Sequence, residues 1–433
     1  MIVPRNRLLF WFAVIAVPFS VLAGAVPETA GFCLAIITAL GAAVAGDALL
    51  SSRALQGVVV EIPPVSRMNL EKEGKVELRL RNPQAQARTL RIALSLPEEI
   101  SSSCDEMVVG LPGGAEWSLL PWPCRPSRRG NFILPAAHVE AASPLGFWNH
   151  RRTLPLQGEI RVYPDLQKEQ KGLGLLFHGA LGAHSLRQVG KGREFEKLRD
   201  YVPGDGMEDI HWKATARRGR PITKVFQIER TQEVYVAIDA SRLSAREEAI
   251  ERQLSAALLL GMAAEQQGDL FGLLSFSDQV ERFVRARSGS AHYQACRDAI
   301  YALQPREVNP DFDEVCALIR LRLRRRALVI ILTALDDPLL QEDFVRNIDL
   351  IARQHLVIVG MMKPAGLAPL FSEPVTSGDE LYEKLGGHMR WHNLEEFSGV
   401  LQRRGVKFVL FESERMGLNL VSEYLNVKKR QIL

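Results

Sequence analysis

Two long apolar segments near the start of the chain predict its first elements. Residues 8–26 carry no charged side chain, and residues 30–46 are again free of charge. Each segment approaches the length at which a helix crosses a bilayer, and the break between them is short. The pattern predicts a transmembrane helical hairpin within residues 1–52, with helices at about 8–26 and 29–50.

The charges around these segments indicate which way the hairpin faces. Arg5 and Arg7 precede the first segment, Arg53 follows the second, and the connection between them holds no Lys or Arg. The positive-inside rule therefore places both ends of the hairpin, and the rest of the chain, in the cytoplasm. The alternative is a signal peptide cleaved near Ala23-Gly24-Ala25. The first apolar run is long for such a peptide, and a second span follows directly.

A different pattern follows over residues 56–165, where short runs alternate between apolar and polar positions. Examples are Lys75–Arg81, Thr89–Leu96 and Glu159–Tyr163, with turn-forming residues between them. Short strands with frequent turns predict a β-sandwich. Residues 166–231 show little regularity and are expected to form a connector, with a flexible loop at Gly172–Gly182.

From residue 232 to residue 433, continuous apolar runs alternate with helical patterns. The runs Glu233–Asp239, Ala327–Thr333 and Leu356–Met361 are typical of buried strands, and Glu247–Gln267 has helical spacing. This alternation predicts an α/β domain whose parallel sheet is covered on both faces. In such a sheet, a ligand site lies at the carboxyl ends of the strands.

Composition and short motifs remove several function classes. The net charge of +4 is small for 433 residues, the five cysteines show no CxxC pair, and no P-loop, GxGxxG after a strand or GxSxG elbow is present. The basic run Arg320–Arg326 lacks interleaved aromatic residues, so we expect no nucleic-acid binding, with binding through this run as an alternative. It is expected to be a solvated helix end, with contact to anionic lipid headgroups as the alternative. His388 and His392 lack the Glu of a zinc-protease motif and are expected in an exposed loop.

Two oxygen-bearing side chains follow the first α/β strand. Asp239 and Ser241 lie two residues apart on the loop after Glu233–Asp239, where both can point at one cation. Oxygen ligands suit magnesium or calcium. The other interpretation is that Asp239 caps the following helix or bonds to loop amides.

A first strand that ends in DxS, within this order of strands and helices, resembles the von Willebrand factor A domain. The resemblance implies a metal-ion-dependent adhesion site with the pattern DxSxS, but Leu243 stands where the second Ser belongs. Ser290 is the candidate for the Thr that this family takes from a later loop. Ala334 follows the strand Ala327–Thr333 where an Asp is expected, and Asp336 and Asp337 come only later. No cofactor is therefore expected, with a divalent cation as the alternative.

The segment Gly192–Arg217 mixes charges, aromatics and a Pro-Gly turn with no clean period. It resembles the signature of the domain-of-unknown-function 58 family, as do the upstream pieces Arg128-Arg129-Gly130, Ser143-Pro144-Leu145-Gly146 and Val162-Tyr163-Pro164. The resemblance implies a bacterial inner-membrane protein with a membrane hairpin, a β-rich region and a von Willebrand A-like domain. The signature residues that we select are Arg193, Glu194, Phe195, Arg199, Tyr201, Gly204, Asp205, Asp209, Trp212 and Arg217.

Three roles remain open for this segment. It can clasp the α/β sheet with its charges paired internally, dock a partner through Arg and Trp anchors, or form an acid–base group from Asp205, Asp209 and His211. The family resemblance implies a link with a MoxR-type AAA+ ATPase in protein maturation or cell-envelope processes. We therefore expect a non-enzymatic scaffold, with a metal-dependent receptor or enzyme as the alternative. The sequence does not indicate the oligomeric state.

Overall fold

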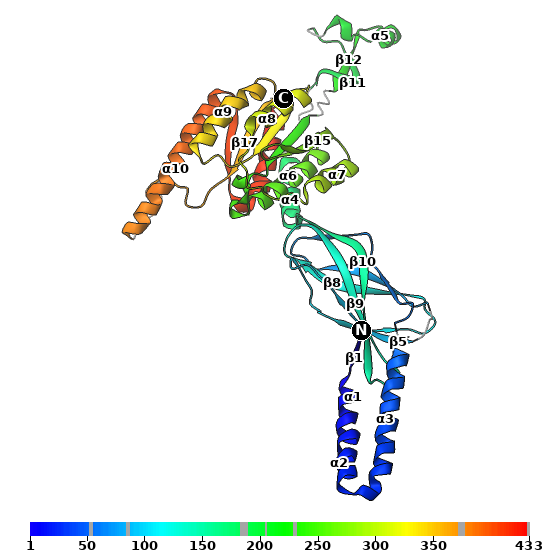
Figure 1. Ribbon diagram of the computed structural model, residues 1–433. Helices are drawn as coiled ribbons and strands as arrows, with labels where there is room; N and C mark the ends of the chain where they lie inside the picture. The colour runs from blue at the N-terminus through cyan, green and yellow to red at the C-terminus, as the bar shows by residue number, and fades with distance from the viewer. Residues whose placement is uncertain are drawn as a thin grey trace. The chain divides into compact units, whose positions relative to one another are not determined.

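A computed structural model describes residues 1–51, 55–83, 87–181, 189–203, 206–227, 232–370 and 377–430. Contacts divide the chain into two compact units, Met1–Asp165 and Leu166–Leu433. The predicted fold class is confirmed. Two apolar helices are followed by antiparallel sheets, and a mostly parallel sheet with helices on both faces completes the chain (Figure 1).

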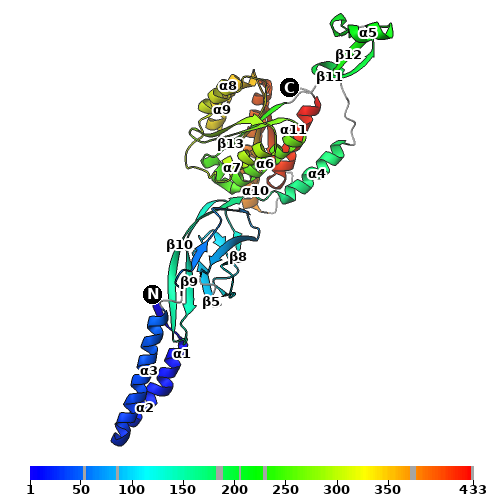
Figure 2. The same cartoon turned by 90° about the vertical axis from the view of Figure 1, so that its right-hand side faces the viewer.

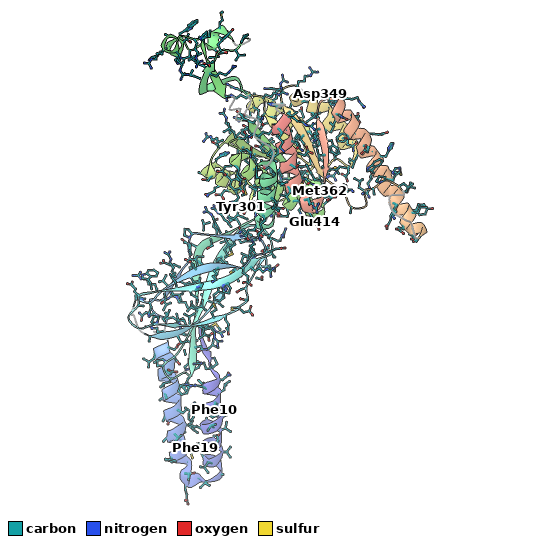
Figure 3. The ribbon with its side chains drawn as sticks, turned by 180° about the vertical axis from the view of Figure 1, so that it is seen from behind. Phe10, Phe19, Tyr301, Asp349, Met362 and Glu414 are labelled. Carbon is teal, nitrogen blue, oxygen red and sulfur yellow. The ribbon has the colours of Figure 1, made fainter. Side chains whose placement is uncertain are left out.

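The N-terminal helices are long and apolar enough to cross a membrane. Only 6% of the first apolar window and 11% of the second is buried, so most side chains face outward. Figure 3 labels Phe10 and Phe19 along the first of these helices. Outward-facing apolar side chains on both helices are typical of contact with lipid rather than with a protein core. The helical elements are α1 (Asn6–Trp11), η1 (Phe12–Ala16), α2 (Val17–Ala25), η2 (Pro27–Thr29) and α3 (Ala30–Ser51).

The rest of the first unit is a sandwich of antiparallel strands. One sheet has the order β1-β10-β9-β5-β7, with β3 added in parallel to β10, and the other has the order β2-β4-β8-β6. Alternate residues of both sheets point inward, as Val76, Leu78 and Leu80 do in β4. They pack around the fully buried Trp122. The strands are β1 (Ile2–Pro4), β2 (Val59–Glu61), β3 (Val65–Asn69), β4 (Gly74–Arg81), β5 (Arg88–Leu94), β6 (Ile100–Ser101), β7 (Met107–Leu111), β8 (Trp117–Pro126), β9 (Gly130–Ala142) and β10 (Trp148–Tyr163).

The second unit contains a six-stranded sheet of order β15-β14-β13-β16-β17-β18. Figure 2 labels strand β13 of this sheet and helices that surround it, among them α6, α8, α9 and α11. Five strands are parallel, and the edge strand β15 is antiparallel to β14. Helices α6, α7 and α11 pack on one face, and α8, α9 and α10 on the other. The strands are β13 (Glu233–Asp239), β14 (Leu270–Phe276), β15 (Val280–Arg287), β16 (Leu328–Leu332), β17 (Leu356–Met362) and β18 (Lys407–Phe411). The helices are α6 (Ala249–Gln266), α7 (Ser290–Ile300), α8 (Phe312–Arg322), α9 (Pro338–Ala352), α10 (Gly378–Arg403) and α11 (Met416–Arg430).

Two local predictions were wrong. The expected loop at Gly172–Gly182 is largely the helix α4 (Gln167–Leu181), because Leu173 is buried in the α/β core and fixes the segment there. Gly172 lies so close to α11 that a Cβ atom would sit 2.7 Å from Leu418. His388 and His392 lie within helix α10 rather than in a loop. Both segments are helical, although their glycines or isolated polar residues had suggested a loop.

Adjacent glycines in α10 give a matched test of this packing. A Cβ atom at Gly386 would meet nothing within 4 Å, whereas one at Gly387 would lie 2.1 Å from the carbonyl oxygen of Gly366. Gly386→Ala should therefore raise stability by about 0.5–1 kcal/mol, because alanine favours the helix. Gly387→Ala should lower it by about 1–3 kcal/mol through overpacking. Thermal unfolding of both variants checks this, and equal shifts would exclude the close approach.

Candidate functional site

Asp239 and Ser241 lie at the carboxyl edge of the sheet, as predicted. Asp239 is the last residue of β13, and parallel strands bring β14 and β16 to the same edge. Both side chains are completely buried, with 0% of their surface exposed. The edge therefore holds a carboxylate that bulk solvent does not reach.

The Asp239 carboxylate has protein partners on both oxygens. The Ser241 backbone N–H donates to Oδ1 at 2.8 Å, and the Thr333 hydroxyl donates to Oδ2 at 2.6 Å. The Ser244 hydroxyl donates to the Asp239 carbonyl at 2.5 Å and lies 3.3 Å from Gln253 Oε1. These bonds satisfy the buried groups of the loop, as buried polar atoms require.

Electrostatics at Asp239 are dominated by desolvation. Burial raises the pKa of the Asp239 carboxyl above its usual value, while the hydrogen bonds from Thr333 and Ser241 act in the opposite direction. Burial disfavours the charged form, and the donors partly restore it. A cation would need to displace or share these donors to reach the carboxylate.

Ser290 does not join this group. Strand β15 is antiparallel to β14, and Arg287 at its end pairs with Phe271 near the start of β14. Ser290, which begins α7, therefore lies at the amino edge, across the sheet from Asp239. The loop that does lie beside Asp239 is fixed by two backbone bonds, Arg306 N–H to the Ala240 carbonyl at 2.7 Å and Arg242 N–H to the Val308 carbonyl at 3.0 Å. The sequence did not identify this loop, because the edge at which Ser290 lies depends on the direction of β15.

Asp336 and Asp337, the acidic residues that follow Thr333 in the chain, bind other groups. Asp336 pairs with Arg246 at 3.2 Å, and the Asp337 side chain accepts the Leu339 N–H at the start of α9. Arg306 pairs with Asp278 at 3.1 Å on the same rim. Within the described ranges, no group of three or more His, Cys, Asp or Glu side chains is placed to hold a metal ion. Thr333, which the sequence analysis left without a role, is the partner that completes the Asp239 cluster.

The Asp239→Asn variant tests whether Asp239 is a structural carboxyl or a metal ligand. The amide keeps an oxygen for the Ser241 N–H and can donate to the Thr333 hydroxyl, so the fold should persist. The raised pKa means that the folded chain holds the proton more tightly than the unfolded chain. The carboxyl therefore favours folding at low pH, and this contribution is lost as pH rises from the ordinary Asp value through the raised one.

The Asp239→Asn variant should not lose this stability as pH rises. Melting temperatures of both chains measured between about pH 4 and 8 will show the difference. Identical pH profiles for the two chains would contradict a titrating Asp239. Calorimetry with magnesium, manganese and calcium tests the cation directly. Heat of binding that is present in the natural chain and absent from Asp239→Asn would establish the metal site.

The signature segment folds as a β-hairpin with a helical tip. Strand β11 (Val189–Asp200) pairs antiparallel with β12 (Ile222–Gln227), and η3 (Met207–Asp209) and α5 (Trp212–Arg218) form the connection. His211 caps α5 by accepting the Ala214 N–H at Nδ1, and Gly219 ends it with a φ of 67°. The prediction of a connector with little regularity was wrong here, because cross-strand pairing holds strands that carry many charges.

The hairpin presents an aromatic and basic surface. Trp212 is 69% exposed and Met207 77% exposed, although neighbouring Ile210 is buried. Arg217 is exposed, and Arg220 pairs with Asp200 at 3.2 Å. Large exposed apolar side chains beside basic ones are characteristic of binding surfaces.

The remaining signature residues are placed less completely. Arg199, Tyr201 and Asp209 are partly exposed. Gly204 and Asp205 lie outside the described residues, so the acid–base group that includes Asp205 stays a prediction. Arg193, Glu194 and Phe195 lie on β11, with side chains outside the described set.

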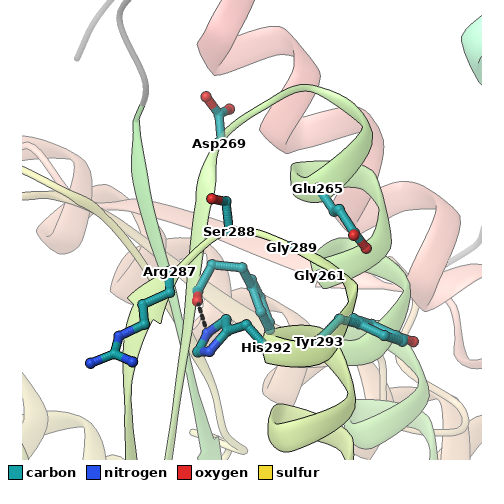
Figure 4. A pocket seen from close by; sticks show the side chains of 9 residues that line it. Gly261, Glu265, Asp269, Arg287, Ser288, Gly289, His292 and Tyr293 are labelled. Atoms are coloured by element: carbon teal, nitrogen blue, oxygen red, sulfur yellow. Dashed lines mark hydrogen bonds between the residues drawn. The ribbon is translucent and has the colours of Figure 1, made fainter.

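A small pocket lies at the amino edge of the sheet, away from Asp239 (Figure 4). The His292 ring points at the Phe271 carbonyl oxygen, with Nε2 at 2.8 Å, so this nitrogen carries the proton. The buried Asp269 accepts the Gln232 N–H at 3.1 Å and pairs with Lys428 at 2.7 Å. The Tyr424 hydroxyl also donates to Asp269, and burial together with this carboxylate raises the Tyr424 pKa. These groups bind one another and tie α11 to the sheet.

The strand order, with one antiparallel edge strand beside five parallel strands, defines a von Willebrand A-like α/β domain. Residues 197–368 match the family described as "Protein of unknown function DUF58". The match includes the signature hairpin from Lys197 onward and the strands β13 to β17 of the sheet. No curated protein matches the chain.

Solved structures similar to parts of the chain have low identity to it. An aerotolerance-related membrane protein of Bacteroides fragilis is 11% identical, over 46% of this chain and 99% of that chain, with a TM-score of 0.30. The conserved hypothetical protein BatB of Bacteroides thetaiotaomicron is 14% identical, over 46% and 99%, with a TM-score of 0.29. Proximal thread matrix protein 1 of the mussel byssus is 13% identical, with a TM-score of 0.27, and the match covers 45% of each chain. None of these likenesses carries an argument about activity.

Proposed function

We propose that this chain is a membrane-anchored, non-enzymatic scaffold that docks a MoxR-type AAA+ ATPase in protein maturation or cell-envelope processes. The observation that carries the proposal is Trp212, which is 69% exposed in the connection between the paired strands β11 and β12. An exposed Trp beside basic side chains is a typical anchor for a partner. The basic residues beside it favour a partner with acidic groups.

The N-terminal helices support a membrane location. Both are long and apolar enough to cross a membrane and have outward-facing apolar side chains, and we infer that they anchor the chain in the bacterial inner membrane. Arg5, Arg7 and Arg53 flank these spans, and the connection between them has no basic residue. The positive-inside rule then places the α/β domain and the hairpin in the cytoplasm, where an ATPase is available.

Co-purification from native membranes tests the proposal. The full chain should retain a MoxR-type ATPase, and Arg199→Ala or Trp212→Ala should weaken that retention while circular dichroism stays unchanged. Equal retention by the variants would contradict docking through the hairpin.

The second candidate is a metal-dependent receptor or enzyme that uses Asp239 and Ser241. Its support is the position of both residues at the carboxyl edge of the sheet, where α/β domains bind ligands. It requires a cation to compete with the donors on Asp239. The calorimetric comparison with Asp239→Asn decides this candidate, because a chain that binds no divalent ion cannot act through one.

A further inference from the structure

Asp47 is a buried carboxylate near the end of an apolar helix, and the proposed function gives it no role. It lies in the last turns of α3 and is 1% exposed. Its carboxylate accepts three hydrogen bonds: from the Ser143 hydroxyl at 2.5 Å, the Leu145 N–H at 2.9 Å and the Phe147 N–H at 3.1 Å. All three donors belong to the connection between β9 and β10, here named the hairpin tip (Ser143–Trp148). It belongs to the sandwich and is separate from the signature hairpin of β11 and β12.

Further bonds hold the hairpin tip to both helices. The Trp148 indole N–H donates to the Val44 carbonyl of α3 at 2.9 Å. The Arg5 N–H, just before α1, donates to the Phe147 carbonyl at 2.9 Å. Strand β1 also pairs with the start of β10. The hairpin tip is therefore fixed beside the ends of both apolar helices.

Helix length places these contacts at the edge of a bilayer. The charge-free part of α3, residues 30–46, is about 25 Å long at about 1.5 Å per residue. That length is close to the roughly 30 Å hydrocarbon core of a membrane. Asp47 on the second helix and Arg7 on the first are the charged residues that flank the apolar segments at this end. The hairpin tip, which Asp47 binds, is thus level with the lipid headgroups.

The exposed chemistry of the hairpin tip fits that zone. Leu145 is 53% exposed, and Leu49 and Leu50 on the last turn of α3 are 77% and 50% exposed. A Cβ atom on Gly146 would lie 3.2 Å from Nη1 of Arg7, so a guanidinium stands directly beside the apolar tip. Apolar side chains next to a cation match the boundary between acyl chains and phosphates.

We propose that the hairpin tip is a membrane-interface contact, in which Leu145 enters the acyl–headgroup boundary and Arg7 meets lipid phosphate. Asp47 is the positioning residue that holds the tip there. The sandwich thereby contacts the bilayer surface directly and is not connected to it only by a free linker. The proposal rests on the membrane anchoring that forms part of the proposed function.

A fluorophore that senses its environment tests the contact in the full chain. The protein is reconstituted in vesicles of phosphatidylcholine and phosphatidylglycerol, in a Cys104→Ser background, since the other four cysteines are buried. A cysteine at Leu145 carries the probe. The control position is Ile133, which is 68% exposed on β9 and roughly 30 Å farther along the strand at about 3.3 Å per residue. A third probe at Leu34, 62% exposed on α3, reports the anchoring itself.

The expected result is blue-shifted emission at position 145 and strong quenching by lipid nitroxides, with neither change at position 133. A quenched probe at 34 together with a water-like probe at 145 overturns the interface contact and leaves the anchoring intact. A water-like probe at 34 overturns both proposals.

Asp47→Ala tests the positioning role separately. The Asp47→Ala variant should lose quenching of the probe at 145 and keep quenching of the probe at 34. Asp47→Asn retains an acceptor oxygen and should therefore keep part of the quenching at 145. Unchanged quenching in Asp47→Ala would show that Asp47 does not position the tip.

Discussion

The Trp212→Ala chain should bind the proposed ATPase partner roughly 30-fold more weakly than the natural chain, because interface Trp anchors contribute about 2 kcal/mol or more. The indole is 69% exposed, so its removal leaves the hairpin intact. The pairing of β11 with β12, the buried Ile222 and the His211 cap of α5 do not depend on it. Equilibrium binding of the purified full chain in nanodiscs measures the loss.

Tyr382→Ala is the matched control for this loss. Tyr382 is 75% exposed on α10, so the change removes an exposed aromatic side chain outside the signature hairpin. Binding should stay within about two-fold of the natural chain, since most surface contacts contribute little. Equal weakening by the two variants would mean that the Trp212 surface is not the docking site.

Asp269→Ala should lower the stability of the α/β unit by about 3 kcal/mol, the largest effect that we expect from one side chain there. Asp269 is 1% exposed and receives bonds from Lys428, Tyr424 and the Gln232 backbone. Its removal leaves the buried Tyr424 hydroxyl and the Gln232 N–H without an acceptor. Tyr424→Phe removes only one donor and should cost about 1 kcal/mol.

Chemical denaturation of the full chain measures these changes. Asp336→Ala is the control, because its pair with Arg246 lies at the surface and should contribute less than about 1 kcal/mol. If Asp269→Ala proves no more harmful than Asp336→Ala, the Asp269 cluster does not hold α11 against the sheet.

The layers of the fold could be predicted because burial leaves a direct pattern in the sequence. The run 233–239 is nearly continuous in apolar residues, and β13 occupies the centre of the sheet with both faces covered. Val76, Leu78 and Leu80 alternate with polar residues, and β4 buries one face only. The two N-terminal apolar helices were predicted from their length and absence of charge.

The predictions that were wrong concern features that contacts between residues far apart in the sequence determine. Gly172 and Gly174 suggested a loop, but Leu173 lies in the core and the segment is helical. Ser290 was expected beside Asp239, yet the antiparallel direction of β15 places it at the opposite edge. Strand direction is set by pairing across the sheet, and a single run of residues carries little information about it.

The role of Asp239 was open for the same reason. The DxS pattern is compatible with a metal ligand and with a buried structural acid. Thr333, 94 positions away in the chain, supplies the hydroxyl that accounts for the second carboxylate oxygen. Its contribution could not be predicted before the ends of β13 and β16 were known to be adjacent.

Site-specific photo-crosslinking from position 212 in native membranes tests docking through the signature hairpin. Docking predicts a crosslink from this position to a MoxR-type AAA+ ATPase, and none to that ATPase from a probe at Tyr382. A crosslink from position 212 only to the α/β unit of its own chain would contradict docking, and it would show that the hairpin is an internal clasp.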